Sequence, residues 1–138
     1  MSEMSEIRPM NLEECVTYAY MMMAIQDGKL EDSERKELIR GLAPLFPNSE
    51  GEQKKFEYWW DLCRKVFLWV REDIEAGGGR LTRNATGIRD CINEAYEGYN
   101  ECKKHIIDTL NNIAKANEEL TEGEARLLSF FNDGINID

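Results

Sequence analysis

The chain has 138 residues, with 17 Lys and Arg against 27 Asp and Glu, so its formal net charge is −10. This charge repels nucleic-acid phosphates and anionic lipid headgroups, which argues against a general nucleic-acid or membrane-surface binder. The length predicts a single domain over residues 1–138, large enough to bury one core. With 42% apolar residues and three Pro, the composition is that of a folded protein and not of a disordered acidic tail.

The N-terminal region predicts neither export nor membrane insertion. Residues 1–9 have no basic region followed by an apolar one, as a signal peptide would. The longest apolar run, residues 18–25, is far shorter than the roughly 20 residues of a membrane span. We therefore expect a soluble, cytoplasmic protein whose four cysteines are reduced and mostly buried. These are Cys15, Cys63, Cys91 and Cys102.

Apolar residues recur at helical spacing through nearly the whole chain, and no segment alternates with period two, so we expect an all-α fold. The first helix runs from Leu12 to about Gln26, and its second half is apolar all round, which predicts a central position in the core. Asp27-Gly28 ends it. A second helix covers Asp32 to Leu42, and Pro44 and Pro47 then predict irregular chain.

Two capping-box patterns predict the starts of later helices. Ser49–Glu52 predicts a third helix that continues to about Ala76, where three glycines end it and open a loop through Arg83. The apolar residues from Ile88 to Ile113 then predict one long helix, or two helices with a kink near Gly98. Thr121–Glu124 predicts the start of a last helix, whose Leu127, Leu128 and Phe131 face inward, with a frayed tail after Asn132.

The most informative feature is an internal repeat at an offset of 90 residues. Each copy consists of a helix, a short acidic turn with one apolar Leu, and a second helix with a Glu in its first turn. The matching pairs are Ala24 and Ala114, Leu30 and Leu120, Glu34 and Glu124, and Leu38 and Leu128. This repeat predicts two pseudo-symmetric halves.

The acidic turns have two interpretations. In the first, Glu34 and Glu124 only cap their helices and face the positive end of the helix dipole, worth about 0.3–1 kcal/mol. In the second, the two turns face one another, and a divalent cation relieves the repulsion between their carboxylates. An EF-hand is excluded, because Met23 and Ile25 would occupy the first two ligand positions and cannot bind calcium.

The duplicated motif resembles the signature of the tellurite-resistance TerB family. The first copy is Ala24-x-x-Asp27-Gly28-x-Leu30-x-x-x-Glu34, and the second is Ala114-x-x-Asn117-x-x-Leu120-x-x-x-Glu124. The resemblance implies a compact all-α fold, an acidic site for a divalent metal, and a non-enzymatic role in a bacterial stress or tellurite-resistance system. Asp27, Glu34 and Glu124 match the acidic places of the motif, whereas Asn117 stands where an Asp is usual.

Our first hypothesis is therefore a TerB-like module that binds Ca²⁺, Mn²⁺ or Mg²⁺, or partner proteins of a stress-response system, through its acidic turns. The candidate metal ligands are Asp27, Glu31, Asp32, Glu34, Glu118 and Glu124. We expect no catalytic residue, no organic cofactor, no nucleic-acid partner and no membrane insertion.

The second hypothesis is a metal-independent adaptor, and a homodimer is one form of it. Trp59 and Trp60 are adjacent and cannot both point into the core of one helix, so one of them can border a partner-binding patch. A third hypothesis is a hydrolase with clustered carboxylates and a metal. The single histidine, His105, has no evident acid or nucleophile in the sequence, and the glycine-rich segment before Arg80 matches no phosphate-binding motif.

Overall fold

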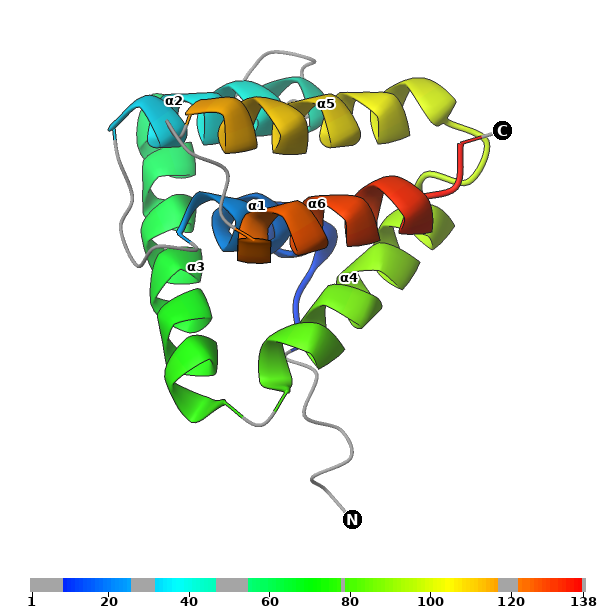
Figure 1. Cartoon of the computed structure of the whole chain (residues 1–138). Helices are drawn as coiled ribbons and strands as arrows, with labels where there is room; N and C mark the ends of the chain where they lie inside the picture. The colour runs from blue at the N-terminus through cyan, green and yellow to red at the C-terminus, as the bar shows by residue number, and fades with distance from the viewer. Residues whose placement is uncertain (1–8, 26–31, 47–54, 78, 117–121, 138) are drawn as a thin grey trace.

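The computed structural model describes residues 9–25, 32–46, 55–77, 79–116 and 122–137. In these ranges the chain forms six α-helices and one 3₁₀ turn, and none of the residues described is in a β-strand (Figure 1). The all-α prediction is confirmed. The elements are α1 (Leu12–Ala24), α2 (Asp32–Leu42), η2 (Ala43–Leu45), α3 (Phe56–Ala76), α4 (Arg80–Ala95), α5 (Asn100–Ala116) and α6 (Glu122–Gly134).

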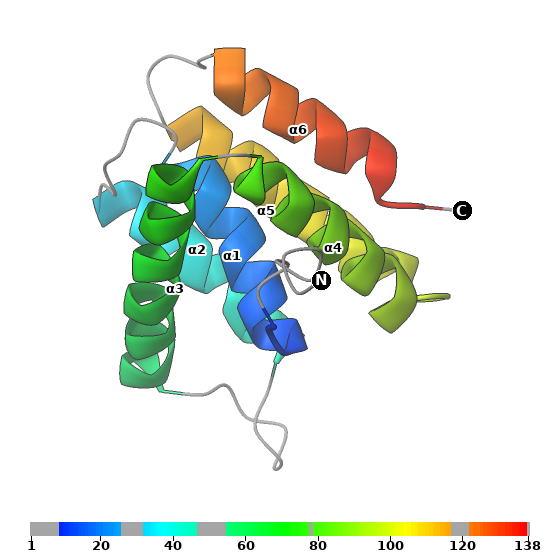
Figure 2. The same cartoon turned by 90° about the horizontal axis from the view of Figure 1, so that it is seen from below.

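Helix α1 forms the centre of the core, as its sequence predicts. Every residue from Cys15 to Ile25 exposes 5% of its surface or less, including the three consecutive methionines. The helix packs against each of the other α-helices, and Figures 1 and 2 show it enclosed by them. Burial of each large apolar side chain stabilises the fold by about 1.5–3 kcal/mol, so α1 is the main contributor to the core.

The remaining helices surround α1. In Figure 1, α3 runs along one side, α2 and α5 pack against each other across the top, and α4 runs diagonally away from the end of α3. Helix α6 packs mainly on α5. The helix boundaries repeat the sequence offset of 90 residues, because α2 starts at Asp32 and α6 starts at Glu122. A pseudo-two-fold relation between the halves stays a prediction.

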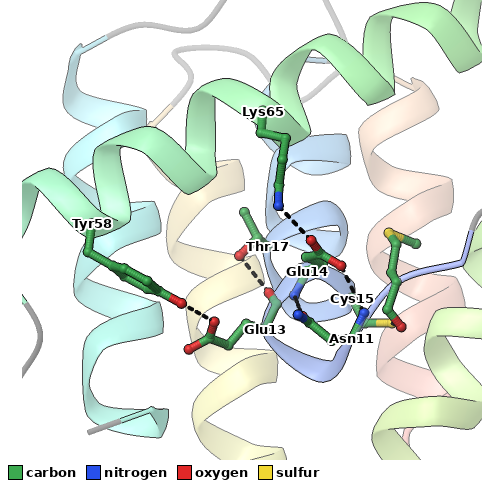
Figure 3. Close-up of polar contacts among 8 residues, drawn as sticks. Asn11, Glu13, Glu14, Cys15, Thr17, Tyr58 and Lys65 are labelled. Carbon is green, nitrogen blue, oxygen red and sulfur yellow. Dashed lines mark hydrogen bonds and ion pairs between the residues drawn. The ribbon is translucent and has the colours of Figure 1, made fainter. Parts of the chain in front are cut away.

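Polar contacts hold α3 in place beside the start of α1 (Figure 3). Asn11 and Glu14 form a capping box, with Asn11 Oδ1 accepting from the Glu14 amide at 2.8 Å and Glu14 Oε1 from the Asn11 amide at 2.9 Å. Lys65 Nζ of α3 donates to Glu14 Oε2 at 2.6 Å, and the Tyr58 hydroxyl donates to Glu13. These contacts fix which face of α3 turns towards solvent.

The pKa of Glu14 reflects these contacts. Burial alone would raise it, but the hydrogen bonds from Lys65 and from the Asn11 amide outweigh burial and hold the pKa below its usual value. The carboxylate therefore stays charged and keeps its contact with α3.

Two predicted boundaries around α3 were wrong. The helix begins at Phe56 and not near Ser49, because Lys55 has an extended backbone with φ −65° and ψ 152°. The capping-box residues Ser49–Glu52 lie outside the described residues. The loop after α3 was predicted to reach Arg83, but α4 already begins at Arg80. Residues 80–83 thus form its first turn.

The stretch from Ile88 to Ile113 is two helices, which confirms one of the two predicted alternatives. Gly98, with φ 84°, lies in the short connection between α4 and α5, a conformation that other residues rarely adopt. The predicted frayed tail was wrong. Helix α6 continues to Gly134, Ile135 is buried, and the amide of Asn136 donates to Asn93 Oδ1 at 2.8 Å. The pairing with Asn93 holds the tail against α4.

The 3₁₀ turn at Ala43–Leu45 replaces part of the irregular chain that Pro44 predicted, because proline fits the first turn of a helix. Within the described ranges, no helix has both the length and the apolar content that crossing a membrane requires.

Candidate functional site

The predicted metal ligands fall into two groups. Asp32, Glu34 and Glu124 lie within the described residues, whereas Asp27, Glu31 and Glu118 lie outside them. Asp32 is exposed at the start of α2, and its carboxylate lies 3.9 Å from Arg35 Nη1. In the part of the chain that the structure describes, no three His, Cys, Asp or Glu side chains form a group that could hold a metal ion.

Glu34 and Glu124 share an unusual environment. Each is the third residue of its helix, and their exposed fractions are only 0% and 2%. The resemblance implies an acidic site that includes both residues, but their side chains do not lie on the surface. Because a carboxylate loses hydration on burial, both residues need compensating interactions, and the partial positive charge at a helix start supplies one.

The helix ends that flank the two acidic turns gather on one side of the molecule. In both views, the ends of α1 and α5 lie on the same side as the starts of α2 and α6 (Figures 1 and 2). The arrangement brings the two copies of the sequence repeat to the same region. Of the matching positions in the two motif copies, Glu34 and Glu124 are the acidic pair that lies within the described residues.

The adjacent tryptophans of α3 separate as predicted. Trp59 is buried, with 1% of its surface exposed, and its ring lies against those of Phe46 and Tyr58. Trp60 is half-buried at the surface beside Phe56, and their ring centroids are 5.4 Å apart. Since neighbouring helical residues differ by about 100° in direction, one tryptophan fills the core while the other borders solvent.

Trp60 lies in a groove between α2 and α3. Three adjoining cavities of about 440, 290 and 390 Å³ lie where these helices meet. The first and second share Arg35 and Trp60, and the second and third share Lys36, Ile39 and Phe56. We call this continuous depression the α2–α3 groove. Its apolar lining includes Phe56, which exposes 55% of its surface.

Charged side chains line the rim of the groove. Its lining contains four cationic side chains, but Asp32 is the only acidic one among the described residues. The four are Arg35, Lys36, Arg40 and Arg64. The guanidinium of Arg35 lies over the Trp60 ring, 4.1 Å from its centroid, and so orients the tryptophan. Arg40 and Arg64 pair with Glu37 and Asp61 of their own helices, at 3.1 and 2.7 Å, so charges of both signs surround the aromatic floor.

Cys63 lies at the inner wall of the groove but is not a reactive thiol. Burial raises its pKa to about 12, although the charge of Arg35 acts in the opposite direction. The thiol is therefore protonated at neutral pH and serves as a small apolar surface. The other three cysteines are also free of disulfide bonds. Cys15 is buried like Cys63, whereas Cys91 and Cys102 are half-buried.

A buried polar cluster that the sequence analysis missed connects α3 to α1 and α4. The Tyr18 hydroxyl donates to Asp73 Oδ2 at 2.5 Å. Asn84 Nδ2 donates to the Tyr18 hydroxyl oxygen and to Asp73 Oδ2, each at 3.0 Å. Arg80 Nη1 is 3.6 Å from Asp73 Oδ1. The sequence held a signal for it, because Asp73 continues the apolar stripe of Val66 and Val70 at helical spacing.

The cluster orients α3 and closes the sharp turn into α4. None of its residues lines the cavities of the α2–α3 groove. His105 has an equally structural contact, with its Nε2 3.0 Å from the carbonyl oxygen of Gly41.

The chain matches no known family model, and neither a curated protein nor a solved structure shows significant similarity to it.

Proposed function

We propose that this chain is a non-enzymatic, intracellular helical module that binds a partner protein in the α2–α3 groove. The observation that carries the proposal is the position of Trp60. A large aromatic side chain lines a surface cavity, beside an exposed Phe56, on a helix that is otherwise anchored to the core. Half-buried aromatic residues in surface grooves are the usual anchors of protein–protein contacts.

The contacts of α3 also support this proposal. Lys65, Tyr58 and the Asp73 cluster hold the helix from the inner side, so the groove is a preformed surface with little ordering cost on binding. Binding to such a surface needs no conformational change of the module.

Site-specific photocrosslinking tests the proposal. A benzoylphenylalanine in place of Phe56 should crosslink one partner in cells of the source organism, and the adduct should disappear when Trp60→Ala is added. The matched control places the same group at Tyr99, which exposes 65% of its surface. Tyr99 belongs to the α4–α5 connection, which lies away from α3 in both views.

The two positions distinguish binding in the groove from nonspecific association of the protein surface. Equal adducts from both positions, or an adduct that survives Trp60→Ala in a variant that keeps its helical circular dichroism, would contradict groove binding.

A second candidate function is binding of a divalent metal by the two acidic turns, as the resemblance to the TerB family implies. The specific observation in its favour is that Glu34 and Glu124 occupy the same helical position and are both buried. The candidate ligand set is unchanged: Asp27, Glu31, Asp32, Glu34, Glu118 and Glu124. A bacterial stress-response role belongs to this candidate.

Metal binding predicts a rise in melting temperature when Mn²⁺ or Ca²⁺ is added, because a ligand that binds only the folded state stabilises it. The rise should vanish in Asp27→Asn/Glu34→Gln and persist in Asp61→Asn/Glu75→Gln, which removes the same charge from exposed positions of α3. If millimolar metal leaves the melting temperature of the natural chain unchanged, the metal candidate is wrong.

A further inference from the structure

We infer that Cys15 and Cys91 form an oxidation-sensitive pair, which a peroxide converts into a disulfide that joins α1 to α4. The inference goes beyond the α2–α3 groove, because neither thiol lines its cavities. Three features of the described residues support it: contact between the two thiols, their unequal exposure to solvent, and a buried tyrosine hydroxyl near Cys91.

The first feature is the contact between the two side chains. Cys15 lies in the first turn of α1 and Cys91 in the second half of α4, and these two helices pack against each other. The Cys15 thiol lies 3.9 Å from the carbonyl oxygen of Met10, and it also makes a side-chain hydrogen bond with Cys91. Two thiols within hydrogen-bond reach need only a small movement to attain the bonded sulfur distance of about 2.05 Å.

The second feature is the difference in exposure between the two thiols. Cys15 exposes 5% of its surface, whereas Cys91 is half-buried and meets solvent. Burial raises the pKa of the Cys15 thiol to about 12, so this thiol is protonated at neutral pH. An oxidant dissolved in water therefore reacts first at Cys91, and Cys15 is the thiol that resolves the product.

The third feature is the hydroxyl of Tyr96, directly after α4. Its oxygen is buried and has no hydrogen-bond partner among the described residues. Burial raises the pKa of Tyr96 to about 12, and the charges of Cys102 and Cys91 add to the rise, so the hydroxyl lies near both sulfur atoms. A buried donor without an acceptor destabilises a fold. An oxygen atom added to Cys91 supplies an acceptor, so Tyr96 favours the oxidised form.

The oxidation proceeds in two balanced steps. In the first, the Cys91 sulfur releases its proton and attacks one peroxide oxygen, so that an S–O bond forms as the O–O bond breaks. The hydroxide that leaves takes up a proton and becomes water. In the second, the Cys15 sulfur attacks the Cys91 sulfur, loses its proton and displaces the hydroxyl as a second water. Two thiols are thus oxidised to one disulfide, and one peroxide is reduced to two waters.

The disulfide would alter the stability of the whole fold. Cys15 and Cys91 are 76 positions apart in the sequence, so the bond closes a long loop that includes α2 and α3. A crosslink between distant residues restricts the unfolded chain more than the folded one. The oxidised protein should therefore melt at a higher temperature than the reduced protein.

Treatment of the full chain with hydrogen peroxide, followed by peptide mapping, tests the inference. The natural chain should yield one crosslinked peptide pair that contains Cys15 and Cys91. Its melting temperature should rise by at least about 5 °C and return to its starting value after reduction with dithiothreitol. Cys91→Ala should abolish the crosslink and the rise, whereas Cys63→Ala, which removes a thiol of α3, should retain both.

Cys15→Ala tests the order of the two steps. Without the resolving thiol, the sulfenic acid of Cys91 should persist and be labelled by dimedone, which reacts with sulfenic acids. Adding Tyr96→Phe keeps the ring but removes the hydrogen-bond donor, and should lower the labelling by at least about threefold. Helical circular dichroism verifies that each variant folds. If Cys15→Ala does not fold, the peptide maps of the natural chain and Cys91→Ala decide the result.

The peptide maps also define the results that would overturn the inference. A disulfide between Cys91 and Cys102 would do so, and so would oxidation of Cys91 that never yields the crosslink with Cys15. Dimedone labelling of Cys102 in place of Cys91 would show that the first step occurs at the wrong thiol. A crosslinked chain that melts at the same temperature as the reduced chain would contradict the link to stability.

Discussion

Single residues decide how closely the helices of this protein approach one another. Gly41, near the end of α2, is the clearest example. A Cβ atom at this position would lie 2.2 Å from Thr109 Cγ2 and 2.7 Å from its Oγ1. The Gly41 carbonyl also accepts a hydrogen bond from the Tyr20 hydroxyl at 3.2 Å. The missing side chain therefore lets α2 and α5 pack closely over the central helix.

Gly41→Ala should destabilise the fold by about 1–3 kcal/mol, the usual cost of overpacking a core. Intrinsic helix propensity alone would predict the opposite sign, since Ala is favoured over Gly by up to about 1 kcal/mol. Urea unfolding measures the difference. Adding Thr109→Ala, which removes the two closest atoms, should restore part of the loss. A Gly41→Ala chain as stable as the natural one would disprove the close approach.

At the scale of helices, the sequence predicted most boundaries where a breaking residue marks them. Helix α2 covers the predicted residues Asp32 to Leu42, and α3 ends at Ala76, before Gly77 with φ 62°. The start of α3 was missed because the capping-box pattern at Ser49 describes only local hydrogen bonds. The extended backbone of Lys55 depends on how α3 meets the rest of the chain, which no local pattern records.

The candidate site was predictable only in part, for a similar reason. Adjacent tryptophans on one helix must diverge, so the separation of Trp59 from Trp60 followed from helix geometry. The groove itself depends on α2 packing beside α3. Periodicity shows that each helix has an apolar face but not which helix covers it, so the grouping of Arg35 with Arg64 around Trp60 was not predictable. The burial of Glu34 likewise depends on tertiary packing.

For the whole molecule, burial of weak acids links stability to alkaline pH. Burial raises the pKa of Cys63 to about 12 and that of Tyr96 to about 12, from ordinary values of 9.0 and 10.0. Burial likewise raises the pKa of Cys15 to about 12, and the charge of the neighbouring Cys91 adds to this. In each case the folded state holds the proton more tightly than the unfolded chain does.

The sign of the pH dependence follows directly. Stability from these groups is complete below about pH 9 and falls as the pH rises towards 12, because the unfolded chain releases its protons first. A fully buried group then costs up to about 1.4 kcal/mol per pH unit. Urea unfolding at a series of alkaline pH values should show this decline, with a shallower slope in Cys63→Ala. A stability that stays constant to about pH 11 would contradict the burial of these thiols and phenols.

The central position of α1 also has a consequence for synthesis. Its residues 12–24 leave the ribosome well before α5, which covers one side of it and ends at Ala116. At about 5–20 residues per second, the chain grows for roughly 5–20 seconds with an incompletely covered apolar helix near its beginning. We expect a nascent segment rich in Met, Tyr and Ala, with its apolar surface exposed, to need the protection of a chaperone. Folding can be completed only when the last third of the chain has emerged.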